Sequence, residues 1–265
     1  MSKDILGQQT LRDVICLQVL IANVCFIGKP GLDNWVLVDA GVSGTFDRIV
    51  DAASEYYGKG NAPKAIILTH GHFDHVGVID KLLEIWKVPV YAHKLEMPYL
   101  TGKKDYPPAD PTVGGGLMSL VSPLYPHKGI NLGDKVTALP DDGSIPVLKD
   151  WRYIHTPGHT PGHISLFRES DGILIAGDAF VTVNQESATA VLTQEKEVNG
   201  PPSYFTPDWE EAKKSVQKLA ALRPSLVITG HGLPLSGSKL TIELQRLADD
   251  FDELAVPDHG RYVKK

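Results

Sequence analysis

The feature that most constrains this chain is a histidine-rich segment, residues 69–75, which reads Thr-His-Gly-His-Phe-Asp-His and directly follows an apolar run at residues 65–68. It places four side chains that can bind a metal within six residues: His70, His72, Asp74 and His75. Side chains alternate along an extended strand, so the first two histidines would lie on the same side, and a helix starting just beyond would turn the other two residues back toward them. Core packing does not explain such a set. The segment therefore predicts a metal centre at the end of a strand.

Three further polar residues each follow an apolar strand and lie next to glycine. His159 lies in a proline-glycine turn, Asp178 follows residues 173–177, and His231 follows residues 226–230. Each of them alone could be structural. With the histidine-rich segment they make five histidines and two aspartates, and loop-borne sites assemble at strand ends. This set is sufficient for two metal ions with open positions.

Strands followed by helices occur in both halves of the chain, which indicates an α/β protein. We expect one bent strand or two adjacent strands in residues 14–27, and further strands at residues 35–41, 65–68, 89–92, 145–148, 151–155, 164–167, 173–176 and 226–229. We expect helices at residues 45–57, 78–86, 208–222 and 240–254. Asp208 should cap its helix, with Glu211 completing a capping box.

The length of 265 residues without an interrupting linker favours a single domain over residues 1–265. Two segments, residues 94–133 and 182–207, have no clean period and are predicted to be irregular and lid-like. Whether they move when a substrate binds is not determined by the sequence.

The composition limits which partners the protein is expected to bind and in which cell compartment it is expected to work. A net charge of −6 weighs against nucleic acid, which requires a basic stripe. Cys16 and Cys25 lie in an apolar stretch and are expected to be buried reduced thiols, neither disulfide-bonded nor metal-binding. Residues 14–27 are too short to span a bilayer and lack a cleavage site. We therefore expect a cytoplasmic protein with a small-molecule substrate and no membrane partner; the sequence leaves its oligomeric state open.

The succession His-x-His-x-Asp-His, Thr-Pro-Gly-His, Gly-Asp and Gly-His resembles the pattern of the metallo-β-lactamase superfamily, over nearly the whole chain up to His231. The resemblance implies an αβ/βα sandwich, in which two mixed β-sheets pack face to face, helices lie outside and the metals lie at one edge. It also implies the ligands: His70, His72 and His159 for one ion, Asp74, His75 and His231 for the other, and Asp178 as a bridge. Asp39, within Val-Asp-Ala-Gly, would orient a ligand histidine without binding the metal.

The resemblance implies two divalent metal ions, with Zn²⁺ preferred and iron or manganese as alternatives. Two such ions, set against Asp74, Asp178 and a bridging hydroxide, would retain about one positive charge, which suits an oxyanion forming on an attacked carbonyl. A bound water has its pKa lowered to about 7, so a metal-bound hydroxide would act as nucleophile. Asp74 is expected to carry the proton to the leaving group. The predicted activity is hydrolysis of a small ester, lactone, thioester or amide.

The pattern is closer to the glyoxalase II and lactonase branches than to the true β-lactamases, which generally lack its Asp-His pair with a bridging aspartate. It departs from both branches: Val181 stands where many lactonases have tyrosine, and the 34 residues after His231 are too few for the C-terminal domain of glyoxalase II. One alternative is a mononuclear iron enzyme similar to persulfide dioxygenases, with iron on His70, His159 and Asp178. The other is a non-catalytic binding protein on the same scaffold.

A partly apolar substrate pocket is expected between the two irregular segments. Its candidate residues are aromatic or methionine side chains: Tyr106, Met118, Tyr125, Phe180, Tyr204 and Phe205. His155 and His163 flank His159 and either support a ligand or belong to the turn. The other histidines outside the pattern, His93, His127 and His259, are expected on the surface or in loops.

Overall fold

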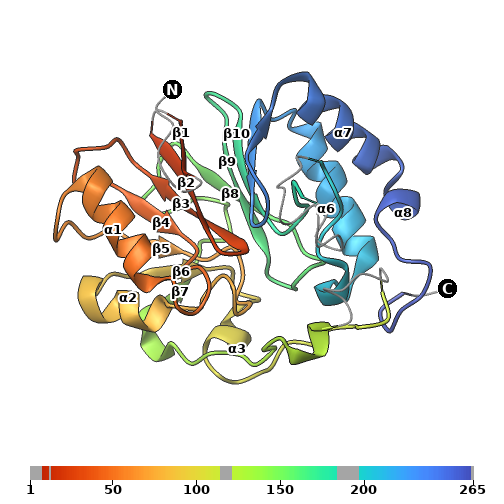
Figure 1. Cartoon of the computed structure of the whole chain (residues 1–265), viewed down its shortest axis with the longest axis horizontal. Helices are drawn as coiled ribbons and strands as arrows, with labels where there is room; N and C mark the ends of the chain where they lie inside the picture. The colour runs from red at the N-terminus through yellow and green to blue at the C-terminus, as the bar shows by residue number, and fades with distance from the viewer. Residues whose placement is uncertain (1–7, 12, 114–120, 184–196, 264–265) are drawn as a thin grey trace.

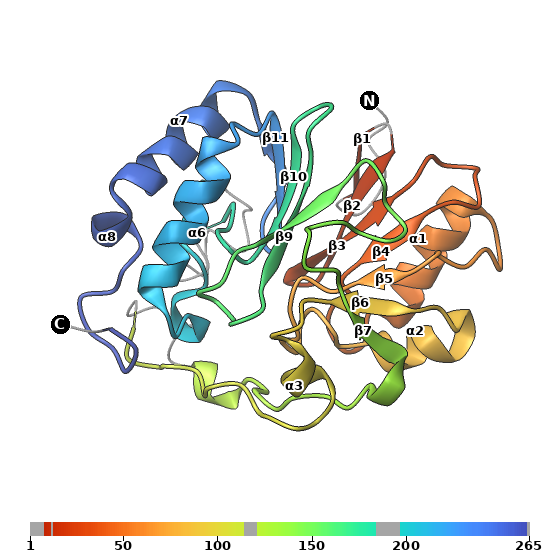
Figure 2. The same ribbon diagram turned by 180° about the vertical axis from the view of Figure 1, so that it is seen from behind.

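The computed structural model describes residues 8–11, 13–113, 121–183 and 197–263. Two β-sheets pack face to face, and helices cover the outer face of each sheet (Figures 1 and 2). This four-layer α/β arrangement is the sandwich that the sequence predicts. None of the helices in the described ranges combines the length and apolar character needed to cross a lipid bilayer.

The first sheet has seven strands in chain order. They are β1 (Gln8–Leu11), β2 (Val14–Val19), β3 (Ala22–Ile27), β4 (Val36–Val38), β5 (Ile66–Ile67), β6 (Val90–Ala92) and β7 (Val136–Ala138). Neighbours are antiparallel as far as β4 and parallel from β4 to β7. The parallel connections need crossovers, and helices α1 (Phe46–Tyr57) and α2 (Ile79–Trp86) provide two of them. Residues 14–27 are thus two strands, which turn at Leu20 with φ 59°.

The second sheet has five strands, in the order β12, β11, β10, β9, β8. Their bounds are Leu235–Ser236, Leu226–Thr229, Ile173–Gly177, Ile164–Arg168 and Arg152–His155. Only β10 and β11 run parallel, and helix α6 (Trp209–Ala221) lies between them in the chain. Helices α7 (Gly237–Asp249) and α8 (Phe251–Leu254) follow β12.

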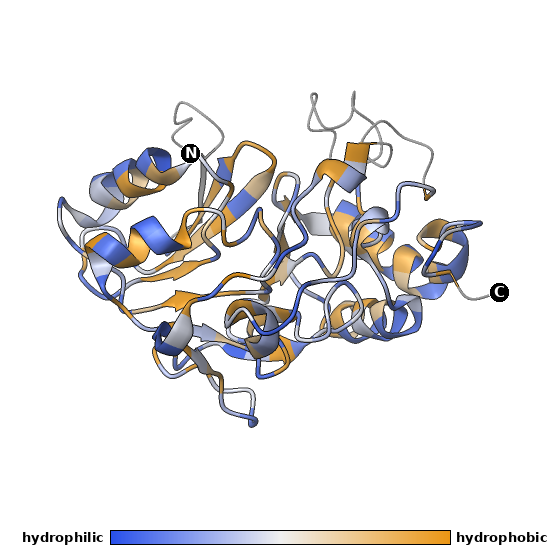
Figure 3. Cartoon of the chain, turned by 90° about the horizontal axis from the view of Figure 1, so that it is seen from below, coloured by the Kyte–Doolittle hydropathy of each residue, from blue (hydrophilic) through white to orange (hydrophobic). Residues whose placement is uncertain are grey.

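Apolar side chains fill three layers, as expected for sheets with both faces covered. One layer lies between the sheets and includes Cys16, Cys25 and Ile228; both cysteines are buried free thiols, as predicted. The other two layers lie between each sheet and its helices. Colouring by hydropathy shows the strands as the most apolar segments and the helices as two-faced (Figure 3). This packing leaves the strand ends as the place where polar side chains can gather.

Several local predictions were wrong. Residues 145–148 form no strand, and the helix expected at residues 240–254 ends at Asp249 and restarts as α8. The segments expected to be irregular contain short elements that the sequence pattern did not show. These are helix α3 (Met97–Leu100) and the 3₁₀ helices η1 (Ser122–Leu124) and η3 (Ser203–Phe205). A further 3₁₀ helix, η2 (Gly133–Lys135), begins where the first segment ends. Elements of three or four residues are too short to produce a period.

Candidate metal centre

The predicted ligands come from four loops that follow strands of both sheets. Residues 69–78 follow β5, residues 156–163 join β8 to β9, Asp178 follows β10, and His231 lies just beyond β11. Strands β4 and β5 are parallel, and so are β10 and β11, so each pair ends at the same edge of its sheet. All seven predicted ligands are buried, with at most 8% of any residue exposed.

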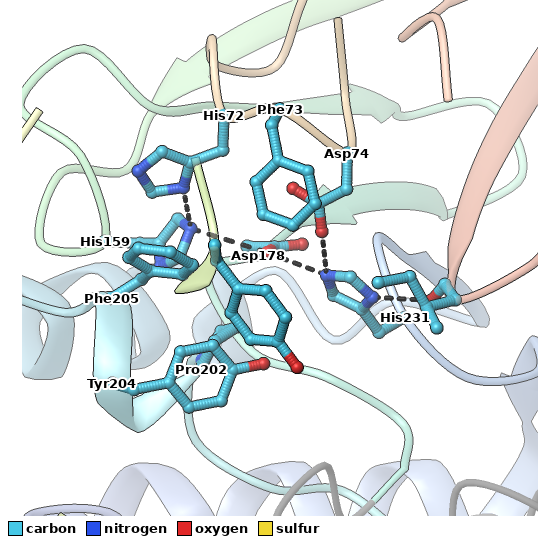
Figure 4. Close-up of a pocket in the computed structure, with 11 residues that line it drawn as sticks. His72, Phe73, Asp74, His159, Asp178, Pro202, Tyr204, Phe205 and His231 are labelled. Atoms are coloured by element: carbon cyan, nitrogen blue, oxygen red, sulfur yellow. Dashed lines mark hydrogen bonds and ion pairs between the residues drawn. The ribbon is translucent and has the colours of Figure 1, made fainter. Parts of the chain in front are cut away.

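His70, His72 and His159 form one set of donors, whose ligand atoms lie within 4.8 Å of one another. Within this set, His72 Nδ1 and His159 Nε2 lie 2.9 Å apart (Figure 4). A tight turn brings the rest of the segment back toward them, because the amides of His75 and Val76 both donate to the carbonyl of His72. The expectation that a helix would do this was wrong, since α2 begins only at Ile79.

A second set consists of Asp74, His75 and His231. A third set, His70, His75 and Asp178, shares His70 with the first and His75 with the second. Asp178 lies between the first two sets: its Oδ2 is 3.4 Å from His159 Nε2 and 3.1 Å from His231 Nε2. The structure thus brings together all seven residues that the sequence singles out. The placement of Asp178 is compatible with the bridging role that the family resemblance implies.

The hydrogen bonding of the cluster fits a metal site. Six buried polar side-chain atoms in the described residues have no hydrogen-bond partner, and three of them lie here: His70 Nε2, His75 Nε2 and Asp178 Oδ1. Buried polar atoms without partners are costly and rare. Nitrogen and carboxylate donors of this kind are the ligands of zinc and iron sites. His75 Nε2 and Asp178 Oδ1 lie 3.5 Å apart as an ion pair without a hydrogen bond. A bound divalent metal ion would give all three atoms the partner that they lack.

Burial sets the protonation of the first donor set. It lowers the pKa of His72 to about 3, and it holds the pKa of His70 and His159 well below the ordinary histidine value. Neutral imidazole is the form that binds a metal. This set is therefore ready to bind without losing a proton.

The second set behaves differently because carboxylates surround it. Burial acts to lower the pKa of His75, but Asp178, Asp39 and Asp74 outweigh it and raise that pKa well above its usual value. The pKa of His231 is raised in the same way, chiefly by Asp178. Burial also acts to raise the pKa of Asp178, but His231 and His75 outweigh it and hold the value low. Without metal, the raised pKa values favour protonated His75 and His231, whose positive charge then balances the neighbouring carboxylates.

Asp39 makes hydrogen bonds to the histidine-rich segment that are compatible with the orienting role implied by the resemblance. Its Oδ2 is 2.8 Å from Nδ1 of His75, and its two oxygens accept hydrogen bonds from the amide and hydroxyl of Thr69. The backbone of Asp39 is left-handed, with φ 62°, which an aspartate tolerates better than most residues. The imidazole of His75 is thereby oriented with Nε2 toward the other ligands.

His163 and the β2–β3 turn orient two more candidate ligands. Nε2 of His163 accepts a hydrogen bond from the amide of Asp178, and burial lowers the pKa of His163 to about 4. Nδ1 of His231 donates to the carbonyl of Ile21 at 2.6 Å. His163 thus hydrogen-bonds to a candidate ligand, whereas His155 stacks on His93.

Sequence reasoning missed Glu96. This glutamate is fully buried at the start of α3, and its carboxylate accepts hydrogen bonds from both loops that supply the first donor set. No sequence period or motif marks it. The sequence features connected with Glu96 are Gly71 and Gly162, the glycines through which the two loops contact its carboxylate.

The cluster faces a shallow pocket whose free space, about 10 Å³, is no more than one water molecule occupies. Besides metal-centre residues, the lining is apolar and aromatic: Ile21, Phe73, Tyr125, Pro202, Tyr204 and Phe205 (Figure 4). Tyr204, Tyr125 and Phe205 therefore lie where the sequence predicts a substrate pocket.

Two of the predicted pocket residues lie elsewhere. Phe180 is fully buried in the core under α6 and α7, because its side chain leaves the strand end on the helix side of the sheet. Tyr106 lies behind His72, with ring centroids 4.5 Å apart, and does not line the pocket. Met118 lies outside the described residues.

Comparison with known proteins places this site in a family. The model of the metallo-beta-lactamase superfamily matches residues 17–231, a range that includes every ligand candidate. The chain belongs to this superfamily. It is 51% identical, over 92% of each chain, to a Bacillus subtilis (strain 168) protein named "Probable metallo-hydrolase YflN".

Solved structures of the superfamily share the fold. A B3 metallo-beta-lactamase described as having an active-site glutamic acid superposes with a TM-score of 0.62 and 18% identity, over 95% of this chain and 90% of its own. TTHA1623, solved in a di-iron-bound form, gives a TM-score of 0.56 and 24% identity, over 84% and 93%. At these identities the likeness establishes the fold alone.

Proposed function

We propose that this chain is a dinuclear metal-dependent hydrolase that acts on a small ester, lactone, thioester or amide. One observation carries the proposal: seven buried donors form overlapping ligand sets joined by Asp178, and this cluster opens into a pocket lined with apolar and aromatic side chains. A relative named as a probable metallo-hydrolase, 51% identical over most of both chains, supports the reaction class.

In this proposal, His70, His72 and His159 would hold one ion, Asp74, His75 and His231 would hold the other, and Asp178 would be available to both. Two bound divalent ions would lower the pKa of water to about 7 and supply a nucleophile at neutral pH. Histidine-rich sets with carboxylates suit zinc first, with iron or manganese as alternatives. The di-iron form of TTHA1623 supports including iron in any metal analysis.

Asp74 is the proposed proton carrier to the leaving group. It is the most exposed of the seven candidate ligands, at 8%, and it lines the pocket. Its Oδ2 lies 3.5 Å from His231 Nε2, at the side of the cluster that faces the pocket (Figure 4). A carboxylate so placed can reach both the donor cluster and a bound substrate, as proton transfer requires.

The pocket lining supports a neutral, partly apolar substrate. None of the described residues that line it is lysine or arginine, and Phe73, Tyr125 and Phe205 pack as an aromatic group with centroids 5.6 to 6.4 Å apart. Anionic substrates such as phosphodiesters usually need basic contacts. Aryl esters and aromatic acyl groups fit these walls better.

The test is metal quantification paired with an activity screen. Protein purified without added metal, then reconstituted with zinc, iron or manganese, is expected to bind two ions per chain. It should hydrolyse members of a panel of aryl esters, lactones and thioesters, and leave phosphodiesters unchanged. A content of one iron per chain, together with oxygen consumption, would contradict the hydrolase proposal and favour the mononuclear iron enzyme. If no metal binds, the remaining hypothesis is a non-catalytic binding protein on the same scaffold.

A further inference from the structure

Glu96 connects the two loops that carry the first donor set. Its Oε1 accepts from the hydroxyl of Thr160 at 2.5 Å and from the amide of Gly162 at 2.9 Å. Its Oε2 accepts from the amide of Gly71 at 3.2 Å and from the hydroxyl of Tyr106. One oxygen thus holds the His159 loop, and the other holds the backbone between His70 and His72.

The loops are shaped to let this carboxylate approach. A Cβ on Gly162 would lie 2.5 Å from the amide nitrogen of Glu96 and 2.8 Å from its Cγ. A Cβ on Gly71 would lie 2.5 Å from the hydroxyl of Tyr106, which itself bonds Glu96. Real Cβ atoms do not approach this closely, so glycine is needed in each loop where it meets Glu96 and Tyr106.

Only a carboxylate satisfies all four partners. Gly71 and Gly162 offer backbone N–H groups, which donate and cannot accept, and they face opposite oxygens of Glu96. A glutamine here would have to turn its NH₂ toward one of these amides. It would turn toward Gly71, because the amide of Gly71 can also donate to the Tyr106 hydroxyl at 3.0 Å.

We propose that Glu96 is a positioning residue for the first metal ion: its carboxylate sets the spacing between the His70/His72 loop and the His159 loop. The inference rests on the proposed function in that these histidines must bind a metal. Glu96 contacts none of them directly, and Tyr106 completes the support, since its ring packs on His72 at 4.5 Å and its hydroxyl bonds Glu96.

Glu96→Gln tests the proposal through metal binding. The variant loses the tie to Gly71 and keeps the tie to Gly162, so we expect binding of the first ion to weaken by about 10- to 100-fold. Dialysed protein should then retain about one ion per chain where wild type retains two. Titration with Co²⁺ should show altered absorption bands for the weakened site and unchanged bands for the other.

Two matched controls separate spacing from general stability. Tyr106→Phe and Thr160→Val each remove one hydroxyl donor but leave both backbone donors on the carboxylate, so each should keep two ions per chain. Unfolding of the metal-free proteins is measured for all four. Equal weakening of both ions in Glu96→Gln, in step with a lower metal-free melting temperature, would show a merely structural role and overturn the proposal.

The remaining outcomes are also decisive. Glu96→Gln with two ions, wild-type affinity and an unchanged Co²⁺ spectrum overturns the positioning role and leaves the hydrolase proposal intact. Wild type that binds no metal overturns the proposed function itself. If Glu96→Gln does not fold, Glu96→Asp carries the test, because its side chain is one methylene shorter and cannot hold Gly71 and Gly162 at the present spacing. It should weaken binding of the first ion and leave the second unchanged, and metal affinity equal to wild type in Glu96→Asp would overturn the proposal.

Discussion

At the scale of single residues, Asp74 separates metal binding from catalysis. Asp74→Asn keeps the shape and one oxygen donor but cannot carry a proton. We expect the hydrolysis rate to fall by at least about 100-fold, the usual size of a general acid or base contribution, while at least one metal ion stays bound. Steady-state kinetics with metal analysis of the same sample checks this. Undiminished turnover would rule out the proton-carrier role.

Phe205 gives a second residue-scale prediction, about substrate choice. Its ring lies 4.9 Å from that of His72 and lines the pocket. Phe205→Ala removes an aromatic contact worth about 1 kcal/mol, so KM for an aryl acyl ester should rise roughly 5- to 10-fold. An acetyl ester serves as the internal control, because it does not reach the aromatic wall. Equal changes for both esters would count against an aromatic substrate pocket.

At the scale of elements, the start of α6 corrects a sequence prediction. Asp208 caps the helix by accepting from the amide of Glu211 at 3.1 Å, but Glu211 pairs with Lys214 and no reciprocal bond completes a capping box in the described structure. Asp208→Ala should therefore lower the free energy of unfolding by about 1 kcal/mol. Glu211→Ala should lower it less, and urea denaturation compares the two. Equal losses of unfolding free energy in the two variants would indicate that Glu211 does complete a capping box.

The loop after β6 carries a pH prediction. His93 was expected on the surface or in a loop; it lies in a loop but is buried, and it stacks on His155 with centroids 4.1 Å apart. Burial lowers its pKa to about 4, with His155 and Lys94 adding to the shift and Asp141 opposing it. Between about pH 4 and 6.5 the unfolded chain binds more protons at this residue, so acidification destabilises the fold.

His93→Asn should remove that contribution. Stability of the metal-free variant should fall less steeply below pH 6.5 than that of wild type, by at most about one proton, or roughly 1.4 kcal/mol per pH unit. Thermal unfolding of both proteins from pH 4 to 7, without metal, gives the two slopes. The histidines of the metal centre are present in both proteins and cancel in the comparison; His155 stacks on His93, so the difference in slope reports on this pair. Parallel curves would show that His93 titrates normally.

At the scale of the whole molecule, the sequence predicts those features that depend on residues close together in the chain. The layered fold follows from apolar strands that alternate with helices. The seven clustered residues stand out because they fall in four short segments, each of which follows an apolar strand and contains or adjoins a glycine. Glu96 was not predictable, since its partners come from three separate segments. Phe180 shows the same limit: an aromatic residue at a strand end can face either the pocket or the helices, and only packing decides. The ligand roles themselves stay predictions until metal is measured.

Long-range ion pairs are a further feature that sequence does not reveal, and Arg168 makes the most consequential one. It lies at the end of β9 in the second sheet and bonds both oxygens of Asp13, which precedes β2 in the first sheet, as well as Asp171. The arginine side chain is 9% exposed and that of Asp13 27%. A bidentate, largely buried pair of this kind ties the two sheets together where their strands begin and end.

Arg168→Ala should therefore cost about 2 kcal/mol in the free energy of unfolding, between the values for surface and buried pairs, because it leaves Asp13 without its partner. Arg152→Ala is the matched control: Arg152 also pairs with a carboxylate and lies over an aromatic ring, but it is more exposed and joins β8 to β9 within one sheet. It should cost less than about 1 kcal/mol. Urea denaturation measures the free energy of unfolding of both variants. Equal losses would show that Arg168 does not stabilise the packing of the two sheets, which would then depend on the apolar layer alone.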